Sequence, residues 1–157
     1  MPTKTSLITF DDLINSTTTE GVQVPNNYFG LNWPNVLVLN GVDYVIRKTG
    51  YSAGVVSPKY VAFNGYGNPM RISSVDMKPF TIESFYSCAA WYDQLSLVML
   101  GQRSGSVLYS KTVQLLTQQK TFIELNWSGV DTISFNTSCD DRCEGTHMTI
   151  DNLSVSL

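Results

Sequence analysis

The amino-acid sequence predicts an all-β protein, an antiparallel β-sandwich of the jelly-roll type. Short apolar runs recur about every ten residues with Gly, Pro and Asn between them, a spacing typical of sandwiches and barrels. Charged residues make up only 15% of the chain and hydrophobic residues 43%, which excludes a disordered protein. The best helical candidate, 113–120, lacks a sustained apolar face, so no long helix is expected.

The predicted strands follow from these runs in chain order. We expect them at 6–10, 36–39, 61–64, 71–74, 80–91, 95–100, 107–115, 121–126, 132–136 and 148–157. Ile123, Leu125 and Trp127 share one parity while Glu124 and Asn126 share the other, which predicts a half-buried strand. Residues 102–106 are expected to form a hairpin loop, and Ser128 with Gly129 a second one.

The two ends of the chain carry similar patterns. Each is a short apolar/polar alternation interrupted by acidic or amide residues, at 8–13 and at 147–155. Near the C-terminus the apolar parity changes between Ile150 and Leu153, and a β-bulge at Asp151-Asn152 explains the change. We expect the terminal strands to lie side by side in a single domain covering 1–157, because no internal repeat or linker interrupts the sequence.

Acidic residues near both ends predict a structural Ca²⁺ site. Asp11 or Asp12 would approach Asp151 if the terminal strands are neighbours, and adjacent carboxylates repel unless a cation or a donor lies between them. The alternative is that Asp11 caps a turn and Asp151 accepts backbone N–H groups at the bulge.

The cysteines suggest an oxidising environment. Cys139 and Cys143 are separated by a short polar turn that can bring two Cα atoms within bridging range, so a disulfide is expected. Reduced thiols and a zinc site remain the alternatives. Cys88 lies in an apolar run and is interpreted as a buried free thiol.

The loops at 25–34, 50–54, 64–69 and 91–94 combine aromatic residues with Gly, Asn and Pro. Such surfaces suit sugars, whose C–H faces stack on aromatic rings while their hydroxyl groups bond polar side chains. The alternative is that single aromatic residues fold back as plugs, which we expect of Trp33 because Pro34 follows it. The candidate ligand-binding residues are Tyr28, Trp33, Tyr51, Tyr66, Trp91, Tyr92 and Asp93.

Several function classes are disfavoured by the sequence. The net charge of −3 forms no basic stripe, which makes nucleic acid a poor partner, and no apolar run is long enough to span a membrane. The chain has one histidine, His147, and lacks the nucleophile-elbow, P-loop and dinucleotide motifs. We therefore expect no enzymatic activity and no catalytic residues. The remaining catalytic alternative is a hydrolase with paired carboxylates from Asp43, Glu83, Asp93 and Glu124.

An ordered series of motifs covers nearly the whole chain. It runs from Thr-Phe-Asp-Asp-Leu and Tyr-x-Gly-Leu-Asn-Trp through Val-Ala-Phe-Asn-Gly-x-Gly-Asn-Pro and Ala-Ala-Trp to Gly-Thr-His-Met-x-Ile-Asp-Asn-Leu. This series resembles small secreted β-sandwich domains of bacterial proteins with a PEP-CTERM sorting signal and of secreted fungal proteins. The resemblance implies a jelly roll similar to carbohydrate-binding modules, or galactose-binding-like domains, and an extracellular location.

These expectations combine into one functional hypothesis with two alternatives. The hypothesis is a secreted, non-catalytic domain that binds glycan or cell-wall polysaccharide through its aromatic loops, its signal peptide lying outside this sequence. The first alternative is a secreted effector or elicitor recognised by a host surface receptor, for example in plant defence. The second is a purely structural surface-layer domain.

Overall fold

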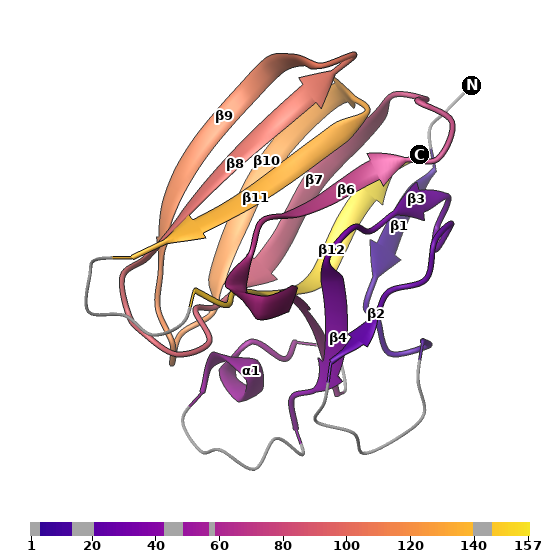
Figure 1. The fold of residues 1–157 in the computed structure, drawn as a ribbon. Coiled ribbons are helices and arrows are strands. Elements are labelled where there is room, and N and C mark those ends of the chain that lie inside the picture. The colour runs from indigo at the N-terminus through magenta and orange to yellow at the C-terminus, as the bar shows by residue number, and fades with distance from the viewer. Residues whose placement is uncertain (1–3, 14–20, 43–48, 57–58, 140–145) are drawn as a thin grey trace.

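The computed structural model describes residues 4–13, 21–42, 49–56, 59–139 and 146–157. Almost all of the regular structure in these ranges is β-strand (Figure 1). The elements are β1 (Thr5–Ile8), β2 (Val22–Gln23), β3 (Leu31–Asn32), β4 (Val36–Asn40), α1 (Gly50–Ala53), β5 (Tyr60–Asn64), the 3₁₀ turn η1 (Gly65–Gly67), β6 (Met70–Ser74), β7 (Phe80–Ser87), β8 (Leu95–Arg103), β9 (Ser106–Leu115), β10 (Thr121–Val130), β11 (Thr132–Ser138) and β12 (Thr149–Ser156). In the described part of the chain, neither short helical segment is long and apolar enough to cross a membrane.

The strands form two antiparallel sheets. The larger sheet has the order β10-β7-β12-β5-β4-β2, with β1 also paired to β12, and the smaller sheet has the order β3-β6-β11-β8-β9. From β5 to β12 the chain alternates between the two sheets, except for the β8–β9 hairpin, which stays within the smaller one. This arrangement confirms the predicted all-β antiparallel sandwich.

Two turn predictions have different outcomes. The β8–β9 hairpin is present and tight, because Ser104 and Gly105 both adopt positive φ (51° and 81°), as a two-residue hairpin turn requires. The second expected hairpin, at Ser128-Gly129, is wrong. Gly129 (φ 72°) instead accompanies a register shift inside β10, which pairs with β7 in the larger sheet, whereas β11 pairs with β6 and β8 in the smaller one.

The terminal strands lie side by side, as predicted. β1 pairs with the second half of β12 from Thr5 opposite Ser156 to Ile8 opposite Leu153, while β5 pairs with its first half. Between these halves the β12–β7 register shifts, and Asn152 has a φ of 49°. Ile150 before the shift and Leu153 after it are both buried in the main core, so the predicted bulge at Asp151-Asn152 is confirmed.

The main core fills the space between the two sheets. It contains the inward residues of β10 that parity predicted, Ile123, Leu125 and Trp127, together with residues from every long strand except β9, which adds only its last residue, Leu115. A smaller second cluster consists of Leu39, Tyr51, Val61, Phe63 and Ala90, with Leu37, Val55 and Trp91 packed against it.

Strands β4 and β5 are covered on both faces. Val38 and Ala62 point into the main core, while Leu39 and Val61, the residues adjacent to them in β4 and β5, belong to the second cluster. Successive side chains point to opposite faces of a sheet, so the second cluster lies on the outer face of the larger sheet. This explains why 61–63 is apolar at every position in the sequence, without the alternation of a half-exposed strand.

Candidate functional site

Four rings meet at one end of the sandwich and form what we call the Trp91 cluster: Tyr51, Phe63, Trp91 and His147. The Tyr51 ring packs edge-on against Phe63 and Trp91 at centroid distances of 5.5 and 5.6 Å. His147 lies 6.3 Å from Tyr51 and 5.9 Å from Phe63. The cluster combines α1, β5 and the residues that flank β7 and β12, which come together at the end of the sandwich that carries α1 (Figure 1).

The segment that carries Tyr51 is held close to the residues before Trp91. The Gly50 N–H donates to the Ala90 carbonyl oxygen at 2.8 Å, and the Ala90 N–H donates to the His147 carbonyl oxygen at 2.9 Å. A Cβ atom on Gly50 would lie 1.7 Å from the Ala89 carbonyl oxygen, so only glycine allows this approach. The sequence prediction of a plain loop at 50–54 missed this short helical turn.

The indole nitrogen of Trp91 is bonded to the single histidine of the sequence. Trp91 Nε1 donates to His147 Nδ1 at 3.1 Å. An indole N–H can only donate, so Nδ1 must accept, and the neutral imidazole carries its proton on Nε2. Burial lowers the pKa of His147 below its usual value, which favours this neutral form. Trp91 is therefore fixed in orientation, although its ring is only partly buried.

Tyr66 lies on the same side of the fold, in η1. Its side chain is 88% exposed and its φ is 57°, a left-handed conformation that tyrosine rarely adopts. The residues on either side of Tyr66 are held by hydrogen bonds. The Gly65 N–H donates to Asn35 O at 3.0 Å, and Gly67 O accepts from Thr146 Oγ1 at 2.8 Å. Thr146 immediately precedes His147, so η1 is linked to the Trp91 cluster.

Tyr92 and Asp93 directly follow Trp91. The Tyr92 side chain is 38% exposed. Asp93 Oδ1 accepts hydrogen bonds from the Thr117 N–H at 2.8 Å and from Thr117 Oγ1 at 2.9 Å, and these bonds lower the pKa of Asp93. Asp93 therefore joins its loop to the β9–β10 connection, a structural role that the sequence prediction did not include.

Two of the predicted contact residues, Trp33 and Tyr28, lie outside the Trp91 cluster and pack with Phe10. Trp33 is 1% exposed, as expected of a plug, and its ring meets Phe10 edge-on at 5.7 Å. Tyr28 packs 5.8 Å from Trp33, and its hydroxyl donates to Asp12 Oδ1 at 2.6 Å. Burial and this hydrogen bond raise the pKa of Tyr28. The expectation that Tyr51 contacts ligand also needs correction, since its side chain is only 3% exposed and its ring packs edge-on against Trp91.

The three acidic residues proposed as metal ligands accept hydrogen bonds. Asp151 is fully buried and accepts the N–H groups of Val56 and Asn152, both at 2.8 Å. Asp11 Oδ1 accepts the N–H groups of Lys59 and Tyr60 at 3.1 and 3.0 Å. These contacts match the capping and bulge roles given as the alternative to calcium. Among the described residues, no group of three or more His, Cys, Asp or Glu side chains is placed to hold a metal ion.

Two buried oxygens in the same region nevertheless lack partners. Asp11 Oδ2 and Asn152 Oδ1 have no hydrogen-bond partner in the described structure. Asp11 follows β1, which pairs Ile8 with Leu153, the residue after Asn152. Unpaired buried oxygens of this kind suit a hard cation, so the residues are compatible with Ca²⁺, which stays a prediction.

The cysteine predictions are tested in part. Cys88 is a free, fully buried thiol, as expected, and burial raises its pKa to about 11. Cys139 packs against the main core. Its proposed partner Cys143 lies outside the described residues, so the disulfide remains a prediction.

The hydrogen bond between His147 and Trp91 was not found from the sequence, where His147 is considered only for catalysis or as a zinc ligand. Trp91 is the last residue of one predicted strand and His147 directly precedes another, and the isolated bridge between Ala89 and Met148 brings these two positions together. Finding this contact from the sequence requires knowing that the strand before Ala89, β7, and the last strand, β12, are neighbours.

Comparison with known proteins informs the fold alone. No protein-family model and no curated protein matches this chain. An apo-form cyclase from Fischerella sp. is similar in structure, with a TM-score of 0.52, 9% identity, and 97% of this chain and 96% of that one covered.

Two further solved structures are less similar. CBM51 from Clostridium perfringens GH95, in complex with methyl-galactose, has a TM-score of 0.44 and 6% identity over 96% of this chain and 99% of that one. An arabinose-bound MgGH51 α-L-arabinofuranosidase has a TM-score of 0.47 and 14% identity over 89% of this chain. The chain spans 25% of the arabinofuranosidase's length.

Proposed function

We propose that this protein is a non-catalytic, extracellular module that binds glycan at the end of the sandwich that carries the Trp91 cluster. Trp91, Tyr92 and Tyr66 are the contact residues in this proposal. Tyr51 and His147 are positioning residues, since they hold the Trp91 ring without offering a comparable exposed surface.

The observation that carries the proposal is the exposed ring of Tyr66. A left-handed backbone costs a non-glycine residue about 1–2 kcal/mol. An aromatic ring that is 88% exposed recovers little of this cost by packing. Residues whose backbone strain is not offset by packing of their own side chains are concentrated at functional sites, which supports a binding role for Tyr66.

The Trp91 ring supplies the second argument. Sugar rings present C–H faces that pack on aromatic faces, and rigid rings bind with little loss of conformational freedom. Trp91 is held by the hydrogen bond to His147 and the edge contact with Tyr51, yet part of its surface stays open. Such a fixed, half-exposed indole beside the exposed Tyr92 suits stacking of a sugar unit.

The non-catalytic part of the proposal is supported by how the reactive groups are used. His147 Nδ1 accepts from Trp91, and the Cys88 thiol is buried with a raised pKa, so the two do not form a nucleophile and base. Two of the four carboxylates considered for hydrolysis have structural roles: Glu83 accepts from Ser154 at 2.5 Å and Ser156 at 2.7 Å, while Asp93 accepts from Thr117. Glu124 is an exposed residue of β10. Asp43 lies outside the described residues.

A glycan array with the purified full chain tests the proposal. We expect saturable binding to at least one class of glycan, reduced for Trp91→Ala and retained for Phe122→Ala. Phe122 is the matched control, because it is also an exposed aromatic residue (51%), but it lies on the sheet face 5.0 Å from Tyr86. An array without saturable signal, or equal loss in both variants, would contradict the proposal.

A further inference from the structure

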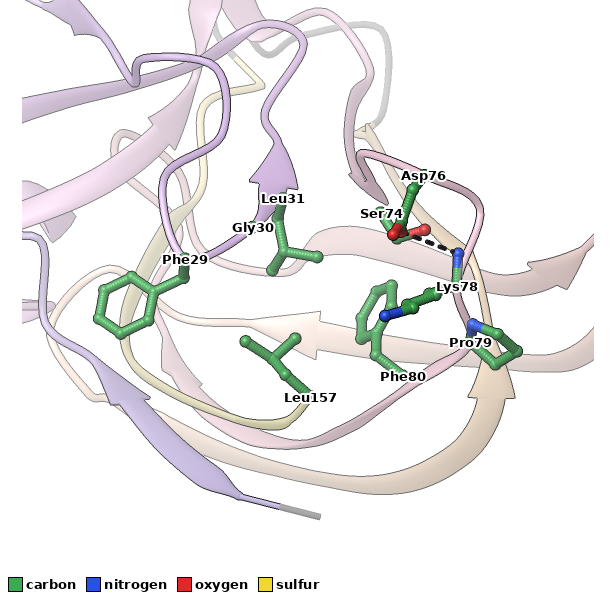
Figure 2. A pocket seen from close by; sticks show the side chains of 9 residues that line it. All are labelled: Phe29, Gly30, Leu31, Ser74, Asp76, Lys78, Pro79, Phe80 and Leu157. Carbon is green, nitrogen blue, oxygen red and sulfur yellow. Dashed lines mark hydrogen bonds between the residues drawn. The ribbon is translucent and has the colours of Figure 1, made fainter. Parts of the chain in front are cut away.

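A cavity opens between the two sheets (Figure 2), and no residue of the Trp91 cluster lines it. Its volume is about 250 Å³. Leu31 and Ser74 line it as a register pair of β3 and β6 in the smaller sheet, and Phe80 lines it from the first position of β7 in the larger sheet. The cavity therefore lies where the two layers separate, and none of its lining residues belongs to the proposed glycan site.

One side of the cavity is apolar. Leu31 is fully buried and Phe80 is 4% exposed, so they form the inner part. Phe29 is half-buried, and Leu157 is 43% exposed at the opening. Figure 2 shows Leu31, Phe80 and Leu157 around the opening, with Phe29 on the far side from Lys78. An apolar group of a ligand would be desolvated between these side chains.

Ser74 provides an unusual polar group in these walls. Its side chain is 7% exposed, and its Oγ has no hydrogen-bond partner in the described structure. The Ser74 N–H, by contrast, donates to Asp131 O at 2.9 Å. A buried hydroxyl without a partner is destabilising, so a ligand oxygen that accepts from it would recover a missing hydrogen bond.

Two charged residues complete the polar side of the cavity. Lys78 and Asp76 are both exposed and lie on the loop between β6 and β7. Asp76 Oδ1 accepts the Lys78 N–H at 3.2 Å, an Asx turn that fixes the loop. The carboxylate of Asp76 is thus used by the loop itself, whereas the Lys78 side chain extends across Phe80 in Figure 2.

We propose that this cavity binds a small monocarboxylate with a compact aromatic or branched apolar body. The body lies between Leu31 and Phe80, and the carboxylate accepts hydrogen bonds from Ser74 Oγ and the Lys78 ammonium. Hydrogen bonds to a charged acceptor are about twice as strong as neutral ones, which favours an anion over an alcohol. Asp76 opposes the anion, so a single charge is preferred to two.

The size of the cavity restricts the ligand further. Sites for drug-sized molecules have volumes of about 300–1,000 Å³, so a cavity of about 250 Å³ accepts one ring or a short branched chain. Phenylacetate is a suitable probe, and 2-phenylethanol is its neutral counterpart with the same ring and nearly the same length.

An amide NMR titration of the full chain with each probe tests the proposal. We expect saturable shifts at residues 29–31 and 74–80, with phenylacetate about five- to tenfold tighter than 2-phenylethanol. Lys78→Gln should remove that preference, and Asp76→Asn should strengthen phenylacetate binding, since the two substitutions change the charge at the carboxylate in opposite directions. Both residues are exposed, so the fold is retained.

The remaining variants make the result decisive. Ser74→Ala should weaken phenylacetate binding, while the part of the preference for phenylacetate over 2-phenylethanol that comes from Lys78 should remain. Lys120 is an exposed lysine that does not line the cavity, so Lys120→Gln should leave phenylacetate binding unchanged. Equal affinity for the two probes would overturn the proposal. It would also be overturned by shifts that do not saturate, or by weaker phenylacetate binding in Asp76→Asn. The result is independent of the glycan array, because the two sites share no residue.

Discussion

The indole N–H of Trp91 donates to Nδ1 of His147 across 3.1 Å, so the orientation of the one partly exposed tryptophan depends on the protonation state of the one histidine. Protonation at Nδ1 would replace the acceptor with a second donor and break this hydrogen bond. Acid should therefore release Trp91 and, through it, the packing with Tyr51.

The first prediction concerns the pH dependence of stability. Burial lowers the pKa of His147 in the folded state, whereas the unfolded chain keeps a value of about 6.5. The unfolded state then binds more protons, so this contribution is fully present above about pH 6.5 and is lost as the pH falls from that value through the lower pKa of the folded state. Melting temperatures should fall between about pH 7 and pH 5.5, above the range in which carboxylates titrate.

The control for this prediction is His147→Gln, whose side-chain oxygen can accept from Trp91 but does not titrate. The melting temperature of this variant should be nearly constant over the same pH range. The sequence contains no second histidine. An equally steep fall of the melting temperature in the variant would therefore show that a group other than histidine is responsible.

The second prediction separates a structural aromatic residue from a binding one. Trp33→Ala should lower the free energy of unfolding by about 3–5 kcal/mol, because the removed ring is fully buried among other rings. Tyr92→Ala should change it by no more than about 1 kcal/mol, because Tyr92 is exposed. Denaturant unfolding of both variants measures the difference, and similar losses would reject the assigned roles.

The third prediction is that Ca²⁺ stabilises the junction of β1, β5 and β12. A ligand that binds only the folded state at a hundred times its Kd stabilises it by about 2.7 kcal/mol. The melting temperature should rise with Ca²⁺ and fall with a chelator. Asp11→Asn should reduce this response, and the surface variant Asp76→Asn should preserve it.

An identical melting curve in Ca²⁺ and in chelator would leave Asp11 and Asp151 with their hydrogen-bonding roles alone. Those roles are already sufficient to explain why Asp151 is buried, because both of its oxygens accept a backbone N–H.

The fourth prediction concerns the thiols. Cys139 and Cys143 should be bridged and Cys88 free, so titration of the unfolded, unreduced protein should detect one thiol. The loop between the two bridged residues is short, so the disulfide would mainly stiffen it, with less stabilisation than the roughly 3 kcal/mol of a fifteen-residue loop. Three titratable thiols would remove the disulfide and weaken the case for an extracellular location.

The sequence predicted those parts of the fold in which one local pattern decides the structure. The alternation at Ile123, Leu125 and Trp127 and the parity change after Ile150 depend only on the two-residue period of a strand. The predicted hairpin at Ser128-Gly129 was wrong because a glycine at positive φ fits a turn and a bulge equally well, and only the strand with which it pairs distinguishes the two.

The binding residues were harder to predict because exposure depends on tertiary contacts. Tyr51 and Tyr66 both follow a glycine in a predicted loop, yet Tyr51 is covered by the second cluster and Tyr66 is open. The cavity at Ser74 was not predicted at all. It depends on where the two sheets separate, which strand patterns do not encode.

The most direct test of the central claim is isothermal titration calorimetry with the best glycan from the array. Tyr66→Ala and Tyr92→Ala should each raise the Kd by about three- to tenfold, as loss of an aromatic contact predicts, while their unfolding curves stay close to that of the parent. Phe122→Ala should leave the Kd unchanged. Unchanged affinity in both tyrosine variants would contradict the assignment of the glycan site to the Trp91 end of the sandwich.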